Sequence, residues 1–182
     1  AASSQSIVLG LSKQEIGITA FFDGSEILIF GALKHQNEAS SGGKLDVVIT
    51  IASPRIPVTV RRKEKRYGVW VNVDPLEIDL APSFYAVATS GPFDQVVSLA
   101  SALLHQISVQ KMLLAVSGTE KVENPEDFTE AVVRIRENEG LYQTLTGAVT
   151  LQNQTLFSAS VTLPANLVEG AYIARIFLMS DG

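Results

Sequence analysis

Short apolar segments separated by turn-forming residues run along most of this chain, and they constrain its fold more than any other feature. The first two segments, Glu15–Phe22 and Glu26–Leu33, flank Asp23-Gly24, a pair typical of a two-residue β-hairpin turn. The other predicted strands are Leu45–Ile51, Ile56–Arg62, Val69–Val73, Phe84–Thr89, Gly147–Leu151, Leu156–Leu163 and Ala171–Leu178. Their length and their β-branched residues predict a protein built mainly from β-sheet.

One of these strands has apolar residues on both of its faces. Val47, Ile49 and Ile51 alternate along one face, and Val48 lies on the other. Because successive side chains of a strand point to opposite faces, this pattern predicts a strand that is partly buried on both sides.

The spacing of the apolar residues changes in the middle of the chain. Over residues 92–107 they recur every three or four positions, which predicts one amphipathic helix. A second helix is marked by Asn124 as N-cap, Pro125 at the first helical position and Gly140 as the stop. The segment Val109–Val116 between them fits either a strand or a helix.

Together these elements predict a mainly β fold with a helical insertion (α+β). We expect a single domain over residues 1–182, an immunoglobulin-like β-sandwich of about nine to ten strands. Two helices, at about residues 92–140, are inserted before the last strands. The connection Glu169-Gly170-Ala171-Tyr172 is typical of the entry to the final strand of such a sandwich.

The composition excludes several classes of function. The net charge of −5 argues against nucleic-acid binding by bulk charge. The absence of cysteine excludes disulfide scaffolds, cysteine-ligated metals and thiol catalysis. No segment reaches the roughly 18–20 apolar residues of a membrane-spanning helix. The small residues at positions 1–4 fit either a mature N-terminus left by signal-peptide cleavage or an arbitrary start of the sequence. The strand that runs directly into Gly182 suggests that a further segment follows in the natural protein.

A run of charge forms the sharpest local feature. Residues 61–66 read Arg-Arg-Lys-Glu-Lys-Arg and hold five of the fourteen basic residues, which leaves nine basic and eighteen acidic residues, a net charge of −9, on the rest of the chain. Such a basic hairpin suits an anionic sulfo, phospho or carboxylate ligand, or anionic lipid head groups. The other interpretation is a solvated hairpin whose charges prevent edge-to-edge sheet pairing, which the charges on both strand faces favour.

The candidate ligand-binding residues are Arg61, Arg62, Lys63, Lys65, Arg66 and Trp70. Trp70 is the single tryptophan, and we expect it to be buried in the sandwich core, with a ligand-stacking platform as the alternative. The two histidines, His35 and His105, lie in different predicted elements. We therefore predict no catalytic residues, no metal site and no cofactor.

Short segments in a fixed order carry a resemblance to a known family. They are Glu26–Gly31, Arg66–Asn72, Phe84–Ala86, Gly140–Tyr142, Leu156-Phe157, Leu163–Asn166, Gly170–Tyr172, Phe177-Leu178 and Asp181-Gly182. The chain resembles an alphaproteobacterial family of putative transmembrane proteins over nearly its whole length. The resemblance implies a signal sequence, a periplasmic domain and one C-terminal membrane helix that this chain does not contain. It also implies an association with sulfite- or sulfonate-type anion permeases. No motif of the family has an assigned chemical role that could be applied to residues of this chain.

These observations predict a non-enzymatic, membrane-anchored domain on the periplasmic side of the bacterial inner membrane. It would act as a protein-interaction or transporter-accessory module, and its partner would be a membrane or periplasmic protein such as an anion permease. The alternative is a small-anion binding module that uses the basic hairpin 61–66. An envelope hydrolase is the third hypothesis, and a nucleic-acid partner is not expected.

Overall fold

The computed structural model describes residues 15–23, 25–34, 44–116, 125–165, 167 and 170–180. Some side chains within these ranges, including those of residues 56–66 and 71–80, lie outside the description. The elements, in chain order, are β1 (Glu15–Asp23), β2 (Glu26–Lys34), β3 (Leu45–Ala52), β4 (Arg55–Arg66), β5 (Val69–Pro82), β6 (Tyr85–Thr89), α1 (Phe93–Val96), α2 (Leu99–His105), α3 (Val109–Val116), α4 (Pro125–Asn138), β7 (Tyr142–Leu145), β8 (Val149–Gln152), β9 (Leu156–Thr162) and β10 (Ile173–Ser180).

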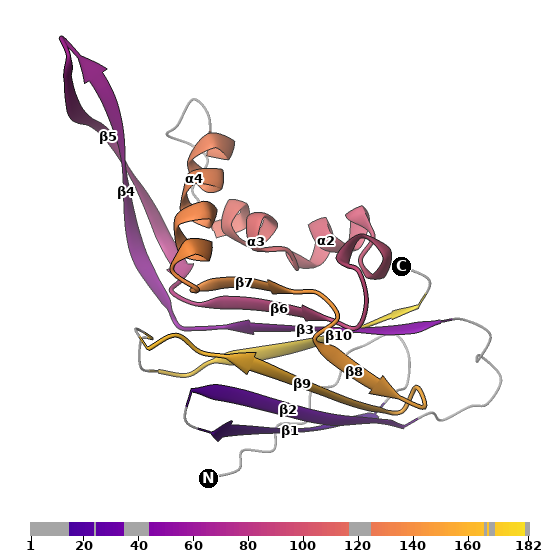
Figure 1. Ribbon diagram of the computed structural model, residues 1–182. Helices are drawn as coiled ribbons and strands as arrows, with labels where there is room; N and C mark the ends of the chain where they lie inside the picture. The colour runs from indigo at the N-terminus through magenta and orange to yellow at the C-terminus, as the bar shows by residue number, and fades with distance from the viewer. Residues whose placement is uncertain are drawn as a thin grey trace.

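Two four-stranded sheets stack on each other, and the helices cover the outer face of one of them (Figure 1). The first sheet has the strand order β1-β2-β9-β8 and the second β10-β3-β6-β7. Nearly all neighbouring strands are antiparallel, but β6 and β7 are parallel. Parallel neighbours need a long crossover, and α1 to α4 supply it, since all four lie between these two strands. The prediction of a mainly β protein with a helical insertion is confirmed.

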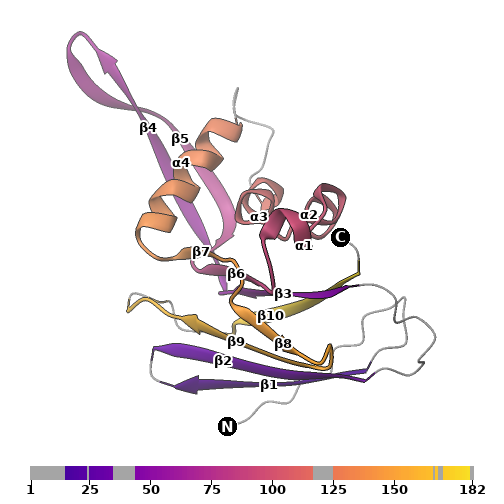
Figure 2. The ribbon, with the colours of Figure 1, turned by 45° about the vertical axis from the view of Figure 1, so that its right-hand side comes forward.

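The second sheet is the middle layer and is buried on both faces. Val47, Ile49 and Ile51 of β3 face the first sheet, where they share a core with Phe157 of β9. Val48 lies in a second core, which it shares with residues of the helices. Figure 2 shows these helices stacked over the sheet. The predicted burial on both sides is confirmed and is more complete than the partial burial expected, because the helices cover the face of β3 that a two-layer sandwich would leave in solvent.

The helix predicted over residues 92–107 is wrong as a single element. It is divided into α1 and α2, because Val97 is extended, with φ −119° and ψ 113°. Ser98 then caps a new helix, and its hydroxyl accepts a hydrogen bond from the Ser101 amide at 3.2 Å. The segment Val109–Val116, which the sequence left open, is the helix α3.

Helix α4 follows its sequence signals closely. It begins at Pro125 and ends at Asn138, and Gly140 follows in the left-handed region with φ +70°. The predicted N-cap, Asn124, lies outside the described residues. Strand β7 was not predicted, because its four residues have no apolar alternation of their own.

Strands β4 and β5 form a separate two-stranded hairpin that projects from the layered body (Figures 1 and 2). They contain 12 and 14 residues, longer than the predicted strands at residues 56–62 and 69–73. The pairing is irregular between Ile56 and Val58, where Pro57 has no amide to donate. A second irregularity lies between Arg61 and Arg62. Such bulges bend a ribbon and increase its twist, and here they lie along the part that leaves the body.

Candidate functional site

A tight turn closes the outer end of the β4–β5 hairpin. Arg66 and Val69 are paired across it, and Tyr67 and Gly68 between them have φ +52° and +83°. Positive φ at both central positions is typical of the type I′ turn, which matches the twist of a hairpin. Glycine accepts this conformation freely, but an L-residue with a side chain pays roughly 1–2 kcal/mol for it. Tyr67 therefore occupies a position that local conformational energy disfavours.

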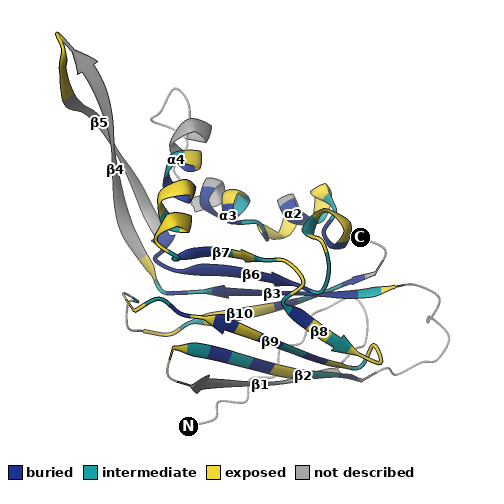
Figure 3. Ribbon diagram, viewed as in Figure 1, coloured by how far each residue is buried: buried dark blue, intermediate teal, exposed yellow. Residues whose placement is uncertain are grey.

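Three large apolar side chains in this turn are in solvent. Tyr67 is fully exposed, and Val69 and Trp70 retain 64% and 66% of their accessible surface (Figure 3). The prediction that Trp70 is buried in the sandwich core is wrong. It lies at the start of β5, on the part of the hairpin that has left the body, so no core is available to it. We call Tyr67, Val69 and Trp70 the apolar tip.

The basic residues of the sequence prediction lie beside the apolar tip along the backbone. Lys65 is paired with Trp70, and Arg62 is paired with Val73. The side chains of residues 61–66 lie outside the described part of the structure. The backbone thus brings all six predicted residues, Arg61, Arg62, Lys63, Lys65, Arg66 and Trp70, to the outer half of one hairpin.

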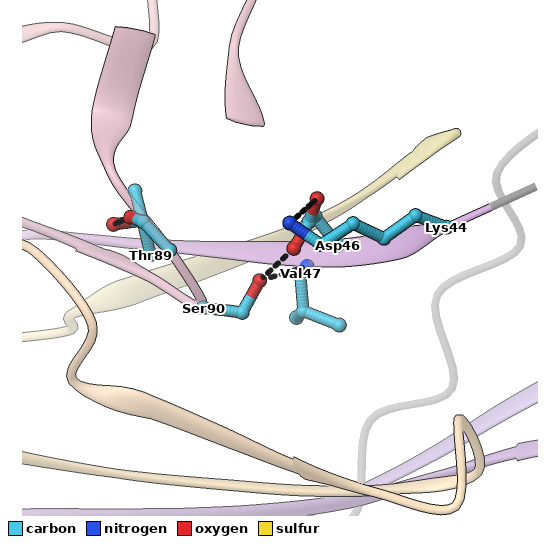
Figure 4. Close-up of polar contacts among 6 residues, drawn as sticks. Lys44, Asp46, Val47, Thr89 and Ser90 are labelled. Carbon is cyan, nitrogen blue, oxygen red and sulfur yellow. Dashed lines mark hydrogen bonds and ion pairs between the residues drawn. The ribbon is translucent and has the colours of Figure 1, made fainter. Parts of the chain in front are cut away.

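A second polar site, which the sequence did not indicate, joins β3 to the end of β6 (Figure 4). The Ser90 hydroxyl donates to Asp46 Oδ1 at 2.8 Å and accepts from the Val47 amide at 3.0 Å. The other carboxylate oxygen of Asp46 lies 3.3 Å from Lys44 Nζ. Asp46 is almost fully buried, and these partners offset the cost of removing its charge from water. The arrangement links β3 to the residue that follows β6.

Two buried tyrosines also use their hydroxyl groups within the fold. Tyr85 donates to the carbonyl of Ile107 at 2.9 Å, which fixes the connection between α2 and α3 to the second sheet. Tyr142 donates to the carbonyl of Pro82 at 2.9 Å, at the base of the hairpin. Burial raises the pKa of both tyrosines, that of Tyr142 to about 12. Both hydroxyls therefore stay protonated at neutral pH and act as hydrogen-bond donors.

An open hollow of about 530 Å³ lies among the helices. Its lining is mixed, with apolar residues of α1 and α3 beside the charged residues Asp94, Lys111 and Glu137. Within the described ranges, no three His, Cys, Asp or Glu side chains are arranged to hold a metal ion. His105 lies at the end of α2, with its ring 5.5 Å from that of Phe177, and His35 is outside the description.

Comparison with protein families gives a match over almost the whole chain. A family model described as "Putative transmembrane protein (Alph_Pro_TM)" covers residues 6–182. The chain belongs to this family. The resemblance found in the sequence is thereby confirmed, and membership in Alph_Pro_TM is consistent with membrane association. Comparison with curated proteins and with solved structures gives no significant match.

The described helices are all too short to cross a membrane. None combines the length and the apolar character needed to cross a bilayer, and the longest, α4, has 14 residues. The C-terminal membrane helix that the resemblance implies stays a prediction.

Proposed function

We propose that this protein is a non-enzymatic interaction module of a membrane-associated protein, and that the β4–β5 hairpin is its binding arm. The module would be anchored on the periplasmic side of the inner membrane. It would act as an accessory of a membrane protein such as a transporter. The body of the domain would be an immunoglobulin-like β-sandwich, and it would support this arm.

The observation that carries the proposal is the apolar tip, at the outer end of an arm that projects from the body. Single exposed apolar residues are ordinary on protein surfaces. Three within four positions, two of them aromatic, are typical of a contact surface, because tyrosine and tryptophan are enriched where proteins bind. The strained backbone of Tyr67 supports the same conclusion, since strain without compensating burial is found where function requires it.

The alternative, a small-anion binding module, rests on the charge of residues 61–66. A binding site for a small anion usually needs donors that converge in a concave pocket. The described residues of the tip, 67–70, are all exposed. We therefore favour an extended contact over a small ligand, although the same basic residues would serve both.

Shortening the hairpin tests the proposal without disturbing the body. Val60 and Leu76 are paired, so replacing residues 61–75 by Asn-Gly closes a shorter hairpin on an existing pair. The buried base of the hairpin, including Ala81, is retained in this variant. We expect the shortened chain to keep its thermal unfolding midpoint, and its far-UV circular dichroism to lose only the signal of the strand residues removed from β4 and β5.

The same deletion is then made in the protein in the cells that produce it, and its complexes are separated on native gels after mild detergent extraction. We expect the deletion to remove a larger complex that the unaltered protein forms. A Leu104→Ser variant, which changes an exposed apolar residue on α2, is the control and should retain the complex. A complex that survives hairpin shortening would show that the arm does not hold the protein partner.

A further inference from the structure

We infer that the hairpin tip binds the surface of a bilayer containing anionic lipids, an inference that rests on the proposed role of the hairpin as a binding arm. Tyrosine and tryptophan are enriched at membrane–water interfaces, because a large apolar ring lies there beside a polar group. The apolar tip presents one of each, together with Val69, to solvent.

The distribution of charge along the hairpin gives the second argument. The outer part, residues 61–73, contains five basic residues and one acidic residue, a charge of +4. The inner part, residues 55–60 and 74–82, contains one basic residue and the acidic residues Asp74, Glu77 and Asp79, a charge of −2. The register joins Val60 to Leu76 and Arg62 to Val73, so the change of sign occurs at one level across both strands.

This polarity fits a flat anionic surface that meets the hairpin end-on. The outer half would be attracted, while the inner half and the body, which brings the chain to −5 overall, would be repelled. Each basic residue near an anionic leaflet strengthens binding by roughly five-fold, and the attraction decays within about one Debye length. Basic residues that flank an inserted aromatic tip are therefore placed where they contribute most.

The chain contains its own reporter for this interaction. Trp70 is the single tryptophan and lies in the tip, so all tryptophan fluorescence comes from the proposed contact. We would titrate the 182-residue chain with vesicles of phosphatidylcholine and with vesicles that also contain phosphatidylglycerol. We expect a blue shift of the emission with the anionic vesicles, quenching by lipids brominated on their acyl chains, and weaker binding as salt is added.

Two matched variants separate the tip from general charge. Lys65→Ala with Arg66→Ala removes the two charges nearest the turn, and we expect binding to fall roughly 30-fold. Arg55→Ala with Arg134→Ala removes the same charge from the base of the hairpin and from α4, where both residues are exposed, and should change binding less than about two-fold. Tyr67→Ser, which retains the reporter, should also weaken binding. Circular dichroism of each variant checks that it folds.

The possible results distinguish this inference from the proposed function. Absence of a blue shift with anionic vesicles, or an equal loss in both charge variants, would overturn the inference. If the vesicles fail while hairpin shortening still removes a larger complex in cells, the arm binds a protein and only the lipid inference is wrong. If soluble glycerol phosphate shifts the emission and the bilayer does not quench it, the site binds a small anion, and this inference is again wrong. If both experiments fail, the hairpin is not a binding arm.

Discussion

Replacing Tyr67 by asparagine should stabilise the outer half of the hairpin. Tyr67 has φ +52°, and this left-handed conformation costs an ordinary L-residue roughly 1–2 kcal/mol, whereas asparagine adopts it at lower cost. Asn-Gly is also the preferred pair for a type I′ turn. Because Tyr67 is fully exposed, the substitution removes no buried contact. We expect a net gain of about 0.5–1 kcal/mol in the local stability of the turn.

Native-state hydrogen exchange is the appropriate assay, because β4 and β5 form a sheet of only two strands, and we expect such a hairpin to open locally without unfolding of the body. We expect the amides of residues 66 and 69 to exchange roughly two- to five-fold more slowly in Tyr67→Asn, with no change in the core strand β3. The reverse substitution provides the control. Asn153, in the turn between β8 and β9, has φ +50° and is exposed, so Asn153→Tyr should be destabilising by a similar amount.

Faster or unchanged exchange in Tyr67→Asn would refute this reasoning, because it would mean that Tyr67 makes a stabilising contact or is not strained. If exchange slows while vesicle binding weakens, Tyr67 destabilises the turn but contributes to membrane binding. A slower exchange with unchanged binding would leave the strain established and remove Tyr67 from the contact.

Three further predictions concern the body. Gly31→Ala should reduce the free energy of unfolding by about 1–3 kcal/mol in urea titrations, because a Cβ there would lie 2.0 Å from Phe157 Cζ, and Phe157→Leu should recover part of the loss in a double-mutant cycle. Tyr142→Phe should cost about 1 kcal/mol at neutral pH, since it removes the hydrogen bond to the Pro82 carbonyl. The pKa of Tyr142 is raised to about 12 in the folded state, so the contribution of this residue to the free energy of unfolding is complete below pH 10. That contribution falls by roughly 3 kcal/mol as the pH rises through 12. In the same titrations, Tyr142→Phe should therefore lose less stability at alkaline pH than the unaltered protein. Ser98→Ala should cost about 1 kcal/mol through the lost N-cap of α2, measured by thermal unfolding, and an unchanged midpoint would contradict the capping role.

Sequence patterns predicted the strands well wherever burial alone determines them. The apolar positions of β3 are explained by two cores, one on each face of the sheet. The periodicity failed over residues 92–107 because it describes which residues are apolar, not whether the backbone between them stays helical. There Ser98 offers a cap that starts a second helix, in which Leu99 and Leu104 are exposed. A local hydrogen bond overrode a regular pattern.

The candidate site could be located from the sequence, but its apolar part was misjudged. The alternation around Trp70 is that of an ordinary core strand, and alternation cannot tell whether a core lies beside the strand. Only the tertiary fold shows that β5 continues beyond the body. The polar link between Asp46 and Ser90 was not predictable for a related reason, since the two residues are 44 positions apart and are joined only by the sheet.

The exposed aromatic residues distinguish between the two interpretations of the basic hairpin. Charges along a two-stranded ribbon guard its unpaired edges against other sheets, and this explains lysine and arginine on β4 without any ligand. The same explanation requires a polar tip, because exposed tyrosine, valine and tryptophan at a ribbon end would favour the association that the charges prevent. Protection of the strand edges therefore explains residues 61–66 but not the exposed Tyr67, Val69 and Trp70. A surface that is both anionic and apolar accounts for both sets at once, and this is why we propose a bilayer and not a small anion as the occupant of the tip.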